Sequence, residues 1–152
     1  MQDQNSCHAS ELGLKKIGSW AGPIANTSSP NEVIWNITIY SSKAHPDMPA
    51  AYLVIKRSST LRSNVATRPV AMPGKRNGEW MEFLFPNTKE KFRARKLLDG
   101  SLEIIQENSA PEEKFSLPAS EKANDLIIYG ESCKEWKLSF KNGRWSQNLW
   151  KE

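Results

Sequence analysis

The sequence has few of the residues on which catalytic sites are usually built. Its 152 residues include only two histidines and two cysteines, and no Gly-x-Ser-x-Gly segment presents a nucleophile. His45 and Asp47 lie together in one proline-rich loop, which is a poor arrangement for a Ser-His-Asp triad. We therefore expect no catalytic residues, and an enzyme of unknown reaction is the last of three functional alternatives.

Long apolar runs and phosphate-binding glycine loops are also missing. No stretch approaches the ~20 apolar residues that a transmembrane helix needs, and the glycines are spread over turns. Cys7, His8, His45 and Cys133 are suitable metal ligands, but apart from the adjacent Cys-His pair their spacing fits no metal motif. The sequence predicts no metal, no cofactor and no transmembrane segment.

The two cysteines leave the cellular compartment open. Cys7 and Cys133 can pair in an exported protein, and in the chain-entropy model such a bond contributes about 4–5 kcal/mol; alternatively, both remain free thiols. Residues 1–6 are polar and do not form a signal peptide. This beginning suits a mature exported protein and equally a cytosolic one. We favour a periplasmic or secreted location, with the cytoplasm as the alternative.

The net charge of +4 and the pI near 9.1 permit an acidic partner without requiring one. Basic residues gather between positions 56 and 96, but Glu79, Glu82 and Glu90 are interleaved with them. Because these acids dilute the positive field, we do not expect a nucleic-acid partner.

Short alternating segments dominate the rest of the chain. Val33, Trp35, Ile37 and Ile39 share one face of the segment 33–41, as in a half-buried strand. Segments 17–24, 51–57, 70–72, 79–85, 91–98, 101–106 and 126–129 read as further strands, and Phe115 marks a short strand within a long loop. Ser10 to Lys16 predicts one short helical turn.

Three dipeptides predict tight hairpin turns. Asn77-Gly78 is the first, and Asp99-Gly100 is the second, with Leu97 opposite Leu102 and Lys96 opposite Glu103. Asn142-Gly143 is the third, and it predicts a closing hairpin over residues 135–150. The apolar face of that hairpin consists of Trp136, Leu138, Phe140, Trp145 and Leu149.

The pattern predicts an all-β protein with eight to ten strands and no long helix. Sequential strands joined by tight turns form a meander, and a meander of this length usually closes because closure removes the edge strands. We expect an antiparallel meander β-barrel over residues 17–152, preceded by an N-terminal arm over residues 1–16 that is loosely held up to Ser10 and then forms the short helical turn. A two-sheet β-sandwich is the alternative.

With that outline, Gly18-Ser19-Trp20 resembles the Gly-x-Trp signature that opens the first strand of lipocalins and the wider calycin group. The resemblance implies that Trp20 plugs one end of the barrel and that a basic residue such as Arg144, beside Trp145, packs across its ring. From the sequence, we expect this chain to lack the Thr-Asp-Tyr loop motif of that family and its helix after the barrel. The resemblance therefore points to a reduced, lipocalin-like barrel.

A barrel of this kind suggests a binding function. We expect a small apolar or amphipathic ligand in the barrel, with Trp35, Trp80, Trp136 and Arg95 as binding residues, the arginine facing an acidic group. The alternative partner is a protein: an inhibitor or immunity-type module would have a filled core and would use exposed loops such as 42–49 and 108–124.

Overall fold

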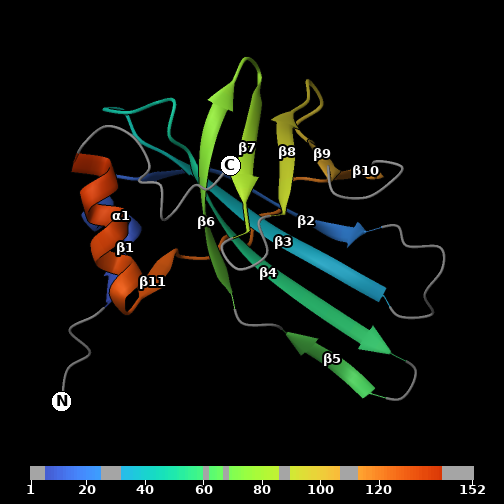
Figure 1. Ribbon diagram of the computed structural model, residues 1–152. Helices are drawn as coiled ribbons and strands as arrows, with labels where there is room; N and C mark the ends of the chain where they lie inside the picture. Colours follow the sequence, from blue (N-terminus) through green and yellow to red (C-terminus); the bar gives the residue numbers. More distant parts are fainter. Residues whose placement is uncertain are drawn as a thin grey trace.

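A computed structural model describes residues 6–24, 32–59, 62–66, 69–85, 90–106 and 113–141 (Figure 1). These residues are almost entirely in strands, with one 3₁₀-helix, η1 (Ala9–Leu12), and one α-helix, α1 (Glu131–Lys141). The strands are β1 (Ser6–His8), β2 (Lys15–Ile24), β3 (Glu32–Ser41), β4 (Ala50–Ser59), β5 (Arg62–Ala66), β6 (Val70–Asn77), β7 (Trp80–Leu84), β8 (Lys91–Lys96), β9 (Leu102–Gln106), β10 (Glu113–Leu117) and β11 (Ile127–Tyr129).

Eight strands form one antiparallel meander in the order β10-β9-β8-β7-β6-β4-β3-β2, and β5 pairs with the far part of β4. The two ends of the meander meet where Trp20 of β2 bridges Ala119, just after β10. Ala21 N donates to Pro118 O at 3.1 Å, and Ser120 N donates to Ser19 O at 2.9 Å. The sheet is thus nearly closed into a barrel, and the predicted all-β antiparallel barrel is confirmed.

The barrel interior follows from the alternation of apolar residues along each strand. Ile37 and Ile39 of β3 are fully buried, as is Leu53 of β4. Each of the other barrel strands contributes at least one buried or half-buried apolar side chain to the same core. Fully burying such a side chain stabilises the fold by roughly 1.5–3 kcal/mol.

Strand β6 turns the corner of the barrel at Pro73-Gly74. Residues 70–73 pair with β4, and residues 74–77 pair with β7. Gly74 allows the Phe83 ring to pack against the backbone, since a Cβ at residue 74 would lie 2.6 Å from that ring. Pro73 lies where the strand changes partners, an irregular position at which a sheet tolerates proline.

The register of the β8–β9 hairpin differs from the prediction by one residue. Lys96 faces Leu102 and Arg95 faces Glu103, because the connection is longer than the two-residue Asp99-Gly100 turn. Leu97 N donates to Ser101 O at 2.8 Å, and Gly100 has a φ of +92°. This is a three-residue loop with a left-handed glycine, the next most common hairpin connection.

A second layer covers the outer face of β3 and β4, where β1, η1, β11 and α1 lie together on one side of the barrel (Figure 1). Cys7 and Cys133 form a disulfide, and β1 pairs with β11. The outer cluster consists of Cys7, Leu12, Leu14, Tyr40, Met48, Ala50, Tyr52, Leu126, Ile128, Cys133 and Trp136. The expectation of a loosely held N-terminal arm is therefore wrong for residues 6–10.

The predicted closing hairpin is wrong over residues 135–141, which belong to helix α1; residues 142–150 lie outside the described residues. Lys, Glu and Leu in this segment favour a helix. The buried residues Cys133 and Trp136 are three apart, which is helical spacing. The expectation that the chain lacks a helix after the barrel is therefore also wrong. Trp136, Leu138 and Phe140 alternate in the sequence as in a strand, and this pattern favoured the hairpin prediction over the helical one.

Hydrogen bonds from side chains of β2 and β3 fasten residues 120–126 to the outside of the barrel. Ser19 Oγ donates to Lys122 O at 2.9 Å, and Thr38 Oγ1 accepts from Asn124 N at 3.1 Å. The Tyr40 hydroxyl donates to Asn124 O at 2.5 Å and accepts from Leu126 N at 2.9 Å. These bonds direct the chain from the barrel to β11.

Candidate functional site

One end of the barrel, which we call the Trp20 end, is closed by protein. Trp20 is 3% exposed, and its Nε1 donates to Gly100 O at 2.8 Å, at the tip of the β8–β9 hairpin. Gly18 lies against the indole ring: a Cβ there would be 2.4 Å from Cη2 of Trp20. Glycine at position 18 thus permits the position of the ring, and the hairpin tip covers it.

The opposite end is built around Trp35. The rings of Phe115 and Phe92 meet its indole edge-on, with centroids 5.4 and 5.5 Å away, and Phe85 lies at 6.4 Å. Such edge-to-face contacts are the favoured geometry for aromatic pairs. Six partly buried side chains pack against the core near this tryptophan, and with it they define the Trp35 end: Ile24, Val33, Ile55, Val70, Phe85 and Phe115.

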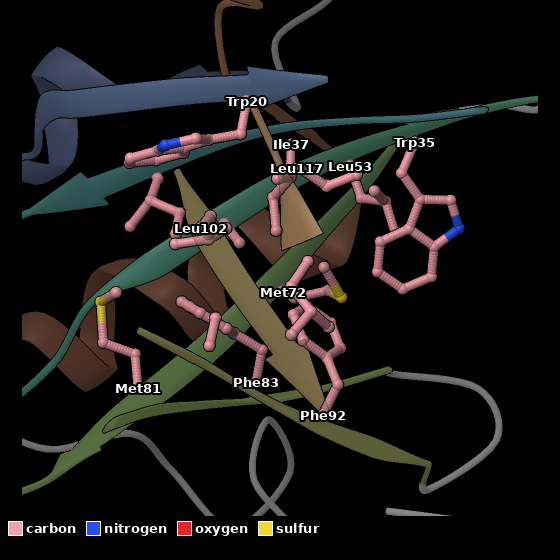
Figure 2. Close-up of a cluster of buried hydrophobic side chains, with 14 residues drawn as sticks. Trp20, Trp35, Ile37, Leu53, Met72, Met81, Phe83, Phe92, Leu102 and Leu117 are labelled. Atoms are coloured by element: carbon pink, nitrogen blue, oxygen red, sulfur yellow. The ribbon is translucent and has the colours of Figure 1, made fainter. Parts of the chain in front are cut away.

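The space between the two ends is filled by side chains. Figure 2 shows Trp20 and Trp35 at opposite sides of the buried cluster, with Leu53 and Leu117 between them. Both leucines are fully buried, as are Met72, Phe83 and Ile104. The partly buried apolar side chains of this core therefore gather at the Trp35 end, where Trp35 itself is 3% exposed.

The four sequence-predicted ligand residues lie in three separate places. Trp35 is inside the barrel, whereas Trp136 belongs to the outer cluster. Trp80 and Arg95 come together on the outer face of β7 and β8, because the inward positions of β8 are held by Phe92 and Ala94. The structure thus does not gather these four residues into one site. Arg144 and Trp145, predicted near Trp20, lie outside the described residues.

Arg95 meets carboxylates of the protein itself. Its Nε donates to Glu103 at 2.7 Å, and its Nη1 donates to Glu79 at 2.5 Å. Lys114 Nζ binds the second oxygen of Glu103 at 2.9 Å. The guanidinium groups of Arg95 and Arg93 lie 4.6 and 5.0 Å from the Trp80 ring centroid, within the range of a cation–π contact.

These contacts shift the pKa values of Glu103 and Arg95. The side chain of Glu103 is 7% exposed, and its hydrogen bond with Lys114, reinforced by Arg95, lowers the pKa of its carboxyl group. The hydrogen bond with Glu103 is in turn the main reason that the pKa of Arg95 is raised. Arg95 was predicted to face the acidic group of a ligand. Glu103 and Glu79 of the protein take the place of that group, so this surface is a structural ion-pair network.

The described residues line two clefts outside the barrel. The first, which we call the Tyr40 cleft, has a volume of about 400 Å³ and is lined by His8, Ala9, Ser10, Leu14, Lys16, Tyr40, Asp125, Leu126 and Ile127. Its only lysine, Lys16, is paired with Asp125 at 2.8 Å. Burial raises the pKa of the Tyr40 hydroxyl, so that group stays neutral at physiological pH.

The second cleft, which we call the Lys15–Lys43 cleft, has a volume of about 370 Å³. Leu12, Gly13 and Lys15 form one wall, and Ser42, Lys43, Ala44 and His45 form the other. Sequence reasoning missed this group, because no local pattern connects residue 15 with residue 43. Sequence reasoning also missed Phe85 and Phe115 at the Trp35 end, although the alternation of Phe83 and Phe85 could have indicated that Phe85 faces the barrel interior.

The class of protein that these features define is a small antiparallel β-barrel with a filled interior and a disulfide-linked outer layer. Within the described ranges, no group of three or more His, Cys, Asp or Glu side chains is arranged to hold a metal ion. No helix in the same ranges has the length and apolarity to cross a membrane. Comparison with known proteins finds no matching family model, no matching curated protein and no matching solved structure.

Proposed function

We propose that this protein binds a small apolar ligand, or the apolar part of an amphipathic one, at the Trp35 end of the barrel. The observation that carries the proposal is the set of partly buried apolar side chains around Trp35, at the end opposite the closed Trp20 end. Ligand sites are lined mainly by apolar and aromatic side chains. The lipocalin-like assignment is part of this proposal and is supported by the closed position of Trp20.

The packing of the interior limits what such a ligand can be. Because Leu53, Met72 and Phe92 are fully buried and Trp35 is 3% exposed, the ligand would lie against Phe85 and Phe115, whose rings contact Trp35, and would not enter the middle of the barrel. An apolar contact of this kind contributes roughly 25 cal/mol per Å² of buried surface. The polar end of an amphipathic ligand would then face solvent.

Tryptophan fluorescence tests the proposal directly. We expect saturable changes when the protein is titrated with one or more members of a panel of fatty acids and aromatic compounds. The change should persist in Trp80→Phe and disappear in Trp35→Phe, because, of the tryptophans that the structure describes, Trp35 is the one whose ring contacts Phe85 and Phe115 at the proposed site. A flat response of the unmodified protein across the panel would refute the proposal.

Two substitutions locate the ligand site without replacing the tryptophan that reports on binding. Ile55→Lys places a charge at the Trp35 end, and Leu98→Lys places the same charge on a fully exposed side chain at the Trp20 end. We expect the first to weaken ligand binding at least about tenfold, a difference of about 1.4 kcal/mol, and the second to leave it unchanged. Equal affinities for the two variants would exclude the Trp35 end.

We also propose that the protein works in an oxidising compartment, periplasmic or extracellular. The Cys7–Cys133 disulfide supports this location, because disulfides persist mainly in exported proteins. Alkylation of the protein in intact cells, followed by mass spectrometry, is the test. Two alkylated thiols would place it in a reducing compartment.

The filled barrel favours a second candidate, a protein-binding inhibitor or immunity-type module that uses the loop between β3 and β4. This loop is fixed: Asp47 O accepts from Arg76 N at 3.0 Å, and Pro49 O accepts from Gly74 N at 2.9 Å. Pro46 and Asp47 remain exposed. The expected result is one stoichiometric partner, recovered from the native compartment, that no longer binds Asp47→Arg. Recovery of no partner would count against this candidate.

A further inference from the structure

The two lysines of the Lys15–Lys43 cleft carry charge that no carboxylate in the described part of the chain compensates. The ionisable lining residues of the cleft are Lys15, Lys43 and His45, and no carboxylate lines it. Among the residues that the structure describes, neither lysine takes part in an ion pair or a side-chain hydrogen bond. The neighbouring Lys16, in contrast, is held by Asp125 at 2.8 Å.

The acids nearest in sequence to the cleft do not neutralise it. Glu11, in η1, faces Lys137 at 3.7 Å and accepts a hydrogen bond from His8 N at 3.2 Å. Asp47, in the same loop as His45, is exposed and does not line the cleft. Two lysines without an ion-pair partner among the described residues thus line one cleft, and together they create a local positive potential that attracts anions.

Both walls of the cleft are held in place by the protein. On one side, Leu12 is buried in the outer cluster, and Gly13 N donates to Ser10 O at 3.1 Å. On the other side, His45 N donates to the buried Ser42 Oγ at 3.3 Å, and Met48 N donates to His45 O at 3.0 Å. A ligand would therefore meet a largely formed site, which reduces the entropy lost on binding.

We propose that the Lys15–Lys43 cleft binds a small anion that carries phosphate or sulfate groups. Lysine ammonium groups act as compact point charges for such oxyanions. The volume of about 370 Å³ is sufficient for a small molecule. This site lies outside the barrel and is separate from the Trp35 end, so it stands or falls independently of the ligand proposed there.

Calorimetric titration with pyrophosphate tests the site, using two double variants with the same change in net charge. Lys15→Ala/Lys43→Ala removes the lysines of the cleft, whereas Lys96→Ala/Lys134→Ala removes two exposed lysines elsewhere. We expect saturable binding by the unmodified protein and by the second variant, and about tenfold weaker binding by the first, as the loss of two exposed charge contacts implies. Urea unfolding curves would verify that both variants fold.

Three further measurements separate specific binding from general attraction and identify the source of the anion. Binding should weaken as the ionic strength rises, and backbone amide signals of Gly13 and residues 42–45 should shift together on saturation. Sedimentation with phosphatidic acid vesicles, compared with phosphatidylcholine vesicles, distinguishes a lipid headgroup from a free anion. Equal losses in the two double variants, or no binding of either pyrophosphate or vesicles, would overturn the proposal.

Discussion

Cys7 and Cys133 are bonded to each other although 126 residues separate them in the sequence, and their Cα atoms lie 5.8 Å apart. Both are at most 5% exposed. The bond joins β1 to helix α1, and both elements lie on the outer face of the barrel. The outer layer is therefore a cross-linked unit that connects the beginning of the described chain to its end.

Removal of this bond should destabilise the whole protein. A closed loop of this length constrains the unfolded chain strongly, and we expect Cys7→Ser/Cys133→Ser to lower the free energy of unfolding by about 4–5 kcal/mol. Urea unfolding at constant pH measures the loss. A difference below about 1 kcal/mol would show that the bond contributes little to stability.

Trp136 should prove essential to the outer layer. It is 2% exposed in the cluster beneath α1, so Trp136→Ala leaves a cavity, with an expected cost of about 3–5 kcal/mol. Trp80→Ala is the matched control, because Trp80 is half-buried on the barrel surface and its loss should cost less. Urea unfolding compares the two variants, and equal costs would contradict this role for Trp136.

Gly18 and Trp20 should be energetically coupled. A Cβ at residue 18 would lie 2.4 Å from the six-membered ring of Trp20, so we expect Gly18→Ala to cost about 1–3 kcal/mol as the ring is displaced. Phenylalanine at position 20 lacks the second ring, and Gly18→Ala should cost less in a Trp20→Phe background. A double-mutant cycle measures this coupling, and strictly additive effects would contradict it.

The sequence was sufficient to predict the barrel because its strands are half-buried. In β3, the alternation of Trp35, Ile37 and Ile39 survives in the structure as three core residues. Alternation identifies the inward face of each strand. When many successive strands each have one apolar face, the sheet that they form shelters all of these faces by closing on itself. The same reasoning failed for residues 135–141, where a period of two and a helical spacing overlap around Trp136.

The arrangement of the candidate site could not be predicted in the same way. Which side chains meet across adjacent strands can be predicted only if the register is known. Because the β8–β9 loop is longer than predicted, Glu103 lies opposite Arg95 and not opposite Lys96. Arg95 was therefore predicted to face a ligand, whereas it faces Glu103. Lys15 and Lys43 come together only because η1 and the β3–β4 loop both pack on the outer layer, which no local pattern encodes.

The Glu103 carboxylate should make the free energy of unfolding depend on pH. Its hydrogen bonds with Lys114 and Arg95 lower its pKa in the folded protein, below the value of about 4.3 expected in the unfolded chain. Such a group stabilises the fold above the unfolded pKa, and this contribution is lost as the pH falls through the folded pKa. We expect the free energy of unfolding to decrease below about pH 4, and Glu103→Gln should reduce the steepness of that decrease. Urea unfolding at a series of pH values tests this, with the exposed Glu121→Gln as control; if both variants show the same pH dependence, the Glu103 carboxylate is not a source of it.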